Sequence, residues 1–213
     1  MKTFLCTFFM LFFSISSYAQ TVTDAKRAFD EGRFLAAFQI LENLSAQGNP
    51  AAMYGLGQLY RNGNGVAEDR KVSCDWFEKA AKQNIGAAMF QYGHCWMIGK
   101  GRPQRPIEAE RWYRKAADLG VAEAVDFLNE TRKNDAPILK KGKELYKQGE
   151  LIDAHNTFLR IARTGNEEAM YYVAKILLEI KKDSWDEWSV CNWFKTSSEF
   201  GYEPSKEYAE RCP

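Results

Sequence analysis

The chain has 213 residues, of which 46% are hydrophobic and 14% aromatic, enough for a packed core and too many for a disordered chain. Its 29 basic and 28 acidic residues nearly cancel. This balance gives no bulk attraction for nucleic acid or for an anionic membrane. We therefore predict a globular protein whose partners are not polyanions.

Residues 1–19, MKTFLCTFFMLFFSISSYA, have the pattern of a cleavable secretory signal peptide. Lys2 precedes an apolar run that extends to Phe13, and the small-x-small stretch ending at Ala19 is typical of a cleavage site. A membrane-spanning helix needs about 20 apolar residues, and serines interrupt this run after about ten. We expect cleavage after Ala19 and a periplasmic or secreted mature protein that is not inserted in the membrane.

A shift of 36 residues superimposes two adjoining segments, and repeats of this length are typical of helical-hairpin arrays. The matched positions are Ala52, Met53, Gly57, Gly63, Gly65, Trp76, Lys79, Ala80 and Ala81 with Ala88, Met89, Gly93, Gly99, Gly101, Trp112, Lys115, Ala116 and Ala117. Each unit reads as an amphipathic helix, a glycine-containing loop and a second amphipathic helix. Gly57 and Gly93 fall inside the first helix of their units, so we expect a neighbouring helix to approach closely there.

The two units, AAMYGLGQLYRNGNGVAEDRKVSCDWFEKAAKQN and AAMFQYGHCWMIGKGRPQRPIEAERWYRKAADLG, resemble the Sel-one-like (Sel1-like) repeat family, which is related to the tetratricopeptide repeats. The resemblance implies an all-α fold, an α/α-hairpin superhelical solenoid that serves as a protein-binding scaffold, usually without catalysis. The second unit departs from the family pattern at Cys95, Trp96 and Arg102.

A second offset, of 117 residues, indicates duplication of a larger unit. It pairs Gly32, Ala37, Gly48, Asn49, Ala52, Met53, Tyr54, Cys74, Trp76, Phe77 and Cys95 with Gly149, Ala154, Gly165, Asn166, Ala169, Met170, Tyr171, Cys191, Trp193, Phe194 and Cys212. Each copy begins with a tetratricopeptide-like hairpin and continues with a Sel-one-like hairpin. The second copy is degenerate, because Ile180 and Lys182 replace the loop glycines, and we expect a differently shaped loop.

These offsets divide the chain into a signal peptide at 1–19, a hairpin with two Sel-one-like repeats at 20–133, and a second copy at 138–213. Between the copies, Asn134, Asp135 and Pro137 predict an interhelix turn as a short connector at 134–137. Counting hairpins at this period predicts about twelve helices.

Four cysteines remain after removal of the signal peptide, an even number in a chain expected to enter an oxidising compartment. Cys74 and Cys95 lie about ten residues before and after the predicted turn near Asn84, at the same height on two antiparallel helices. Cys191 and Cys212 repeat this spacing. We therefore prefer the pairs Cys74–Cys95 and Cys191–Cys212 over the other two connectivities that four cysteines allow.

A metal site made of Cys74, His94 and Cys95 is the alternative. Adjacent helical residues point about 100° apart, so His94 and Cys95 do not easily face one ion. The 117-residue copy keeps both cysteines but has Arg211 in place of His94. We therefore predict no metal and no cofactor.

The mature sequence lacks the common hydrolase, nucleotide and CxxC motifs, so we predict no catalytic residues and no enzyme activity. His94 and His155 are the only histidines, and His155 is most simply a surface or packing residue. The acidic pairs Glu108 with Glu110 and Glu167 with Glu168 are interpreted as solvated faces or helix N-terminal charges.

The resemblance implies that the first helix of each hairpin lines the concave surface. Positions that vary between units there are the candidate partner-binding residues: Gln58, Arg61, Asn62, Gln91, His94, Met97 and Lys175. The predicted function is that of an exported adaptor or assembly factor that binds another protein. The alternatives are an immunity-type protein that neutralises a toxin delivered to the periplasm, and a cell-envelope enzyme, which no motif supports.

Overall fold

The computed structural model describes residues 20–180 and 188–212, and helices are the only regular structure in that part of the chain. The predicted signal peptide and the loop of the second copy at 181–187 lie outside it. The elements are α1 Val22–Asp30, α2 Phe34–Ala46, α3 Pro50–Asn62, α4 Arg70–Ala81, α5 Gly86–Ile98, α6 Pro106–Asp118, α7 Ala122–Lys147, α8 Leu151–Ala162, α9 Glu167–Ile180, α10 Trp188–Glu199, the 3-10 helix η1 Glu203–Ser205, and α11 Lys206–Glu210.

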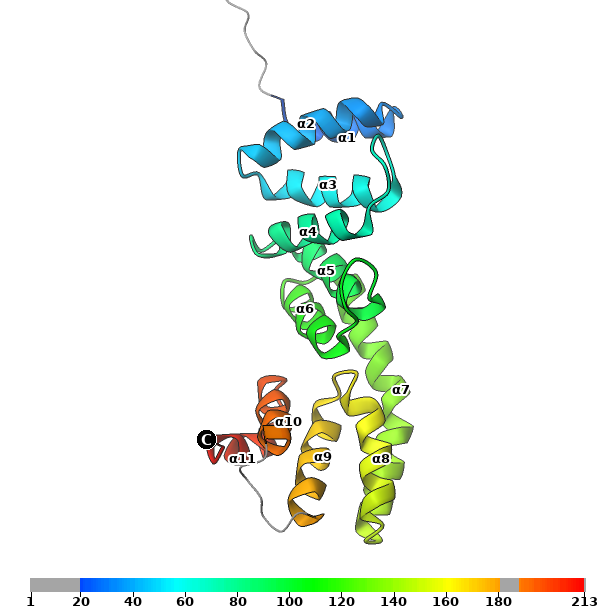
Figure 1. The fold of residues 1–213 in the computed structure, drawn as a ribbon, viewed down its shortest axis with the longest axis vertical. Helices are drawn as coiled ribbons and strands as arrows, with labels where there is room; N and C mark the ends of the chain where they lie inside the picture. Colours follow the sequence, from blue (N-terminus) through cyan, green and yellow to red (C-terminus); the bar gives the residue numbers. More distant parts are fainter. Residues whose placement is uncertain (1–19, 181–187, 213) are drawn as a thin grey trace, which may run out of the picture.

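The helices stack in chain order into an elongated solenoid (Figure 1), because each packs mainly on the next along the sequence. From α1 to α6 they form hairpins stacked along the long axis. The long α7 then runs down one side, α8 returns beside it, and α9 to α11 form the remaining layer. The predicted all-α, α/α-hairpin solenoid is confirmed.

The 36-residue period corresponds to the hairpins α3–α4 and α5–α6, which repeat the same packing. Trp76 and Trp112, at equivalent positions in α4 and α6, are half-buried against the core formed by these helices. The lysine three residues after each tryptophan lies over the indole ring, with Nζ 3.9 Å from the Trp76 centroid and 4.6 Å from the Trp112 centroid. The repeated tryptophans are therefore packing residues with a cation on their outer face.

Gly57 and Gly93 allow the close approach expected from their places inside helices. A Cβ atom on Gly57 would lie 2.5 Å from Cε1 of Phe77, and one on Gly93 would lie 2.6 Å from Cε1 of Tyr113. Both rings are essentially fully buried. The two helices of each hairpin are therefore held together by an aromatic ring that lies directly on a glycine.

Replacing Gly57 by alanine should destabilise the protein by about 1 to 2 kcal/mol, because overpacking against a ring that cannot move exceeds the gain in helix propensity. Gly55→Ala, in the same helix, is the matched control. Its Cβ would come closest to the two terminal methyl groups of Leu41, at 2.8 and 3.0 Å, which are the flexible end of a side chain and not a rigid ring. Urea unfolding of the two variants measures the difference, and equal stability would contradict this account of the packing.

The 117-residue offset is visible in the helix boundaries of the second half. Helices α8 and α9 begin 117 residues after α2 and α3, and α10 begins 118 residues after α4. The terminal segment expected to match α5 is shorter, because η1 and the five-residue α11 replace a continuous helix. The helices of the second copy thus follow the register of the first until the C-terminus.

The interhelix turn predicted at 134–137 is wrong, because α7 continues through it and forms one helix of 26 residues where two were expected. Asp135 does not cap the backbone; its buried carboxylate accepts a hydrogen bond of 3.0 Å from Nδ2 of Asn166. Pro137 removes one donor to the carbonyl of Lys133, and both residues are exposed, so water can satisfy that carbonyl.

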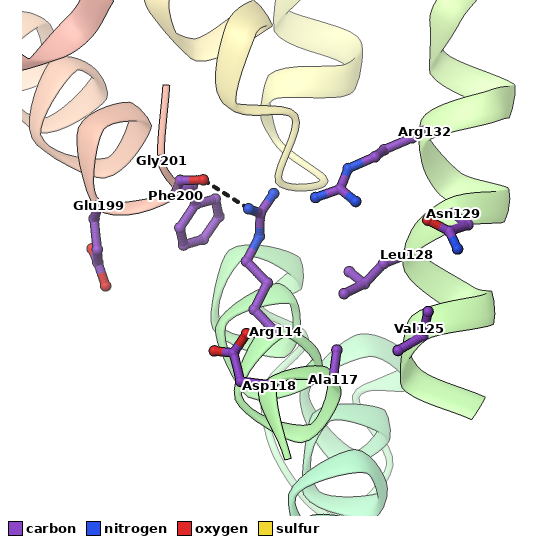
Figure 2. A pocket seen from close by; sticks show the side chains of 10 residues that line it. All are labelled: Arg114, Ala117, Asp118, Val125, Leu128, Asn129, Arg132, Glu199, Phe200 and Gly201. Carbon is purple, nitrogen blue, oxygen red and sulfur yellow. Dashed lines mark hydrogen bonds between the residues drawn. The ribbon is translucent and has the colours of Figure 1, made fainter. Parts of the chain in front are cut away.

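Arg114 of α6 connects the first half of the chain to the second in addition to α7 (Figure 2). Its guanidinium donates at 2.9 Å to Oε1 of Glu110, at 2.7 Å to Oε2 of Glu167 in α9, and at 2.8 Å to the carbonyl of Phe200 after α10. Figure 2 draws the last of these three bonds. Beside it lies a cavity of about 390 Å³ that Arg132 of α7 also lines. One side chain therefore ties three helices together at the junction.

Candidate functional site

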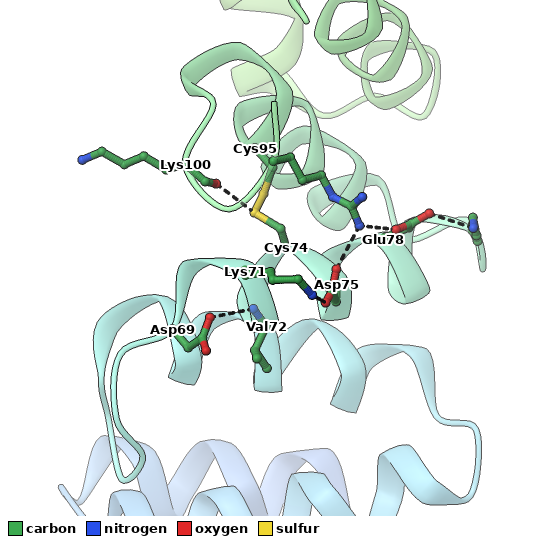
Figure 3. Close-up of polar contacts among 10 residues, drawn as sticks. Asp69, Lys71, Val72, Cys74, Asp75, Glu78, Cys95 and Lys100 are labelled. Carbon is green, nitrogen blue, oxygen red and sulfur yellow. Dashed lines mark hydrogen bonds and ion pairs between the residues drawn. A yellow bond between two sulfur atoms is a disulfide. The ribbon is translucent and has the colours of Figure 1, made fainter. Parts of the chain in front are cut away.

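The two hairpins of the 36-residue repeat are joined by a disulfide bond between Cys74 in α4 and Cys95 in α5, whose Cα atoms are 6.0 Å apart. Figure 3 shows the bond crossing between the two helices, with the carbonyl oxygen of Lys100 lying 3.5 Å from Sγ of Cys74. Cys191 in α10 is bonded to Cys212 just beyond α11, with Cα atoms 5.5 Å apart. The pairing is the one that the spacing favoured, and it leaves neither Cys74 nor Cys95 free as a metal-ligating thiolate.

A small cavity of about 60 Å³, which we call the notch, lies beside the Cys74–Cys95 bond on the side of α3 and α5. Its lining residues are Arg61, Arg70, Ser73, Cys74, Phe77, Gln91, His94, Cys95, Ile98 and Lys100. Three of the predicted binding residues, Arg61, Gln91 and His94, therefore meet at one place. The disulfide bond and the ring of Phe77 form the apolar part of the lining.

Arg61 is held in position by neutral acceptors. Its Nη1 donates to Oε1 of Gln91 at 2.6 Å, which links α3 to α5, and its Nε donates to Oδ1 of Asn62 at 3.3 Å. Its guanidinium carbon lies 5.9 Å from the Phe77 ring centroid. The amides orient the guanidinium, but they do not neutralise its charge.

His94 is half-buried in an aromatic cluster. Its ring lies edge-on to Phe90, with centroids 4.6 Å apart, and its Nδ1 is 3.2 Å from the hydroxyl of Tyr113. Burial lowers the pKa of His94 below its usual value, and the nearby positive charge of Arg61 lowers it further. Burial also raises the pKa of the Tyr113 hydroxyl. Burial and the charge of Arg61 both favour the uncharged imidazole of His94, and the Tyr113 hydroxyl occupies its Nδ1.

The remaining predicted binding residues lie at different kinds of position. Gln58 is half-buried on α3, and exposed Asn62 reaches the notch only through its contact with Arg61. Met97 packs against the core around Tyr113 and Leu128. Lys175 lies on α9, with Nζ 5.6 Å from the Tyr146 ring centroid, so the structure does not bring it to the notch.

Comparison with protein families decides the nature of the repeats. The family model described as the Sel1 repeat matches residues 50–85 and 86–121, the two hairpins α3–α4 and α5–α6. The chain therefore contains two repeats of the kind found in Sel1-repeat proteins. Such proteins are helical-repeat scaffolds that mediate protein–protein interaction and are generally not catalytic.

The chain is also similar to one curated protein and to solved structures. Over 123 residues the chain is 29% identical to the chitin synthase regulator SKT5 of Saccharomyces cerevisiae; the match covers 56% of this chain but only 17% of that regulator. A solved Sel1 repeat protein of Oxalobacter formigenes is 22% identical over 89% of this chain and 74% of its own, with a TM-score of 0.47. The antigen c5321 of uropathogenic Escherichia coli, which has an SLR fold, is 20% identical over 89% and 40%, with a TM-score of 0.46.

Glu110, in the second Sel1 repeat, corrects one interpretation from the sequence. Its charge predicts a solvated face or a helix N-terminus, but only 4% of its surface is exposed. Its Oε1 accepts from Arg114, its Oε2 is buried without a partner, and Gly165 packs directly against its side chain. The 36-residue alignment contains the missed signal, since Glu110 occupies the position of the buried Cys74.

Burial raises the pKa of Glu110 from 4.5 to about 7, against the lowering effect of Arg114. Because the folded pKa lies above the unfolded one, the native state binds more protons between pH 4.5 and 7, and stability falls as the pH rises through that range.

Glu110→Gln should therefore flatten the pH profile and raise the free energy of unfolding at pH 8 by about 2 kcal/mol, while changing it little at pH 5. This gain is smaller than the free energy equivalent to the whole pKa shift, because the amide of glutamine accepts a weaker hydrogen bond from Arg114 than the carboxylate does. Urea unfolding at both pH values measures this. The exposed Glu144→Gln serves as the control, and a variant less stable than wild type at pH 8 would refute the prediction.

Among the helices that the structure describes, none combines the length and apolar character needed to cross a membrane. In the same part of the chain, no three potential ligands among His, Cys, Asp and Glu lie close enough together to hold a metal ion.

Proposed function

We propose that this Sel1-repeat protein is an exported, non-catalytic scaffold that binds another protein on the surface around the notch. The observation that carries the proposal is the convergence of Arg61, Gln91 and His94, from two successive repeats, at one point beside a disulfide bond. Arginine and aromatic or apolar groups that meet in a shallow recess are typical centres of protein interfaces.

The rigidity of this surface supports a role in recognition. Arg61 is fixed by Gln91, and His94 is fixed by Tyr113, so both side chains lose little conformational entropy when a partner binds. The Cys74–Cys95 bond fixes α4 relative to α5 directly below them. Binding would thus use a preformed site and need no enzymatic group or cofactor.

The proposed export is supported by two kinds of observation. Residues 1–19 have the pattern of a secretory signal peptide. Two disulfide bonds suit an oxidising compartment such as the periplasm or the outside of the cell. The partner is accordingly expected in that compartment.

Affinity capture from periplasmic extract, followed by mass spectrometry, tests the proposal. We expect a protein captured by the wild type to be lost with Arg61→Ala/His94→Ala and retained with Lys147→Ala/Arg160→Ala, which changes two exposed cations elsewhere. Circular dichroism melting confirms that both variants are folded. Retention of every captured protein by the first variant would refute the proposed surface.

A further inference from the structure

We infer that the notch receives the carboxylate of an aspartate or glutamate side chain presented by the partner protein. This inference rests on the proposed function and adds the chemistry of the group that is recognised. It is carried by the size of the notch, by the hydrogen-bonding groups around it and by their charge.

The size of the notch excludes a whole small-molecule ligand. Pockets that enclose metabolites or drug-sized ligands usually measure about 300 to 1,000 Å³, whereas the notch measures about 60 Å³. That volume accommodates the end of one side chain. The rest of its chain must then lie on the surface outside, as the chain of a bound protein does.

The side chains at the notch offer hydrogen-bond donors. Oε1 of Gln91 is occupied by Arg61, which leaves the amide NH₂ of Gln91 as its free group. Nδ1 of His94 is occupied by Tyr113, so Nε2 is the ring nitrogen that can contact a ligand. The guanidinium of Arg61 has five donors, of which Asn62 and Gln91 use two. A ligand group that accepts several hydrogen bonds complements this set.

The charge around the notch is positive and only partly compensated. Its lining contains three cationic residues and no carboxylate. Arg70 is already paired with Glu68, with Nε 2.6 Å from Oε1, and Lys100 reaches away from the disulfide bond toward solvent (Figure 3). Arg61 has only amide partners among the described contacts. An acidic side chain would supply the missing negative charge, and a charge-assisted bond to a guanidinium is among the stronger hydrogen bonds in proteins.

The apolar groups beside Arg61 make this contact favourable. Ile98, which is 58% exposed, borders the notch together with the Cys74–Cys95 bond and Phe77. A partner that covers Ile98 would exclude water from the ion pair and so strengthen it. The geometry fits an acidic residue with an apolar neighbour in the partner's sequence.

Nuclear magnetic resonance tests this inference with the peptide Ac-EEEE-NH2 as the probe and Ac-QQQQ-NH2 as its uncharged match. In the wild type, the glutamate peptide should shift the Arg61 Nε–Hε and Gln91 side-chain amide signals saturably, and the glutamine peptide should not. In Arg61→Gln the dissociation constant, followed at Gln91, should rise at least tenfold. In Arg33→Gln, where Arg33 is an exposed arginine in the turn before α2, it should be unchanged.

Unshifted signals, equal shifts with both peptides, or unchanged affinity in Arg61→Gln would each overturn the inference. The capture experiment separates this failure from failure of the proposed function. Capture that depends on Arg61 without peptide binding would contradict only the carboxylate chemistry, whereas peptide binding without Arg61-dependent capture would contradict the proposed function.

Discussion

Replacement of Arg114 by alanine is expected to lower the free energy of unfolding by about 3 to 5 kcal/mol at pH 8, the range typical for removal of one partner from a buried ion pair. Arg114 is the only residue that pairs with Glu110 in the described structure. It also closes the junction through Glu167 and the carbonyl of Phe200. The variant leaves a buried carboxylate without its ion-pair partner and removes one of the links between α6 and the second half of the chain.

The loss in Arg114→Ala should be smaller at pH 5, because there Glu110, with its pKa of about 7, is protonated in the native state and needs no counter-charge. Arg111→Ala is the matched control on the same helix. Arg111 pairs with Glu108 and Glu199, whose side chains are 37% and 53% exposed, and pairs this accessible to solvent contribute about 0 to 1 kcal/mol. Denaturant unfolding of both variants at pH 5 and pH 8 decides the matter; equal losses for Arg114 and Arg111 would contradict the role assigned to Arg114.

Removal of the first disulfide bond, by Cys74→Ala/Cys95→Ala, is expected to cost about 3 kcal/mol, as the chain-entropy model gives for a loop of this length. The bond joins residues 21 positions apart on adjoining Sel1 repeats, and both cysteines are buried. Its loss should therefore loosen the packing between α4 and α5 and the notch above it. Thermal unfolding with and without reductant measures the effect.

Cys191→Ala/Cys212→Ala is the control for the position of the bond. This variant removes a bond between cysteines that are also 21 positions apart. Because Cys212 lies after the last short helix, we expect mainly local fraying of α11. Hydrogen exchange should then increase around Tyr208 and remain unchanged in α4 and α5. A global loss of protection in this variant and none in Cys74→Ala/Cys95→Ala would contradict the account.

Most of the fold is predictable from two sequence offsets. The 36-residue period locates the hairpins α3–α4 and α5–α6, and the 117-residue offset locates the starts of α8 and α9. Both work because helical repeats bury the same positions in every unit. The turn predicted at 134–137 is wrong, because the residue types at Asp135 and Pro137 cannot reveal a tertiary contact. The carboxylate of Asp135 accepts a hydrogen bond from Asn166, 31 residues away.

The candidate site is predictable to a smaller extent. The alignment of the repeats identifies Arg61, Gln91 and His94 as residues that vary in the first helix of each hairpin. The structure brings these three side chains together. The structure does not bring Lys175 to them, because Lys175 lies on α9 in the second copy, away from α3 and α5 along the solenoid. The prediction for Glu110 is wrong, because charge alone indicates a solvated face, whereas its contacts with Arg114 and Gly165 bury it.

Photo-cross-linking in the native compartment tests the central claim, that a partner protein binds at the notch. A benzophenone-bearing residue would replace Ile98, which borders the notch, or Ile152 in α8, which is 71% exposed and far from it in sequence. We predict an adduct with one protein from position 98, lost when Arg61→Gln is added, and no adduct with that protein from position 152. Equal cross-linking from both positions, or an adduct at 98 that persists in Arg61→Gln, would contradict it.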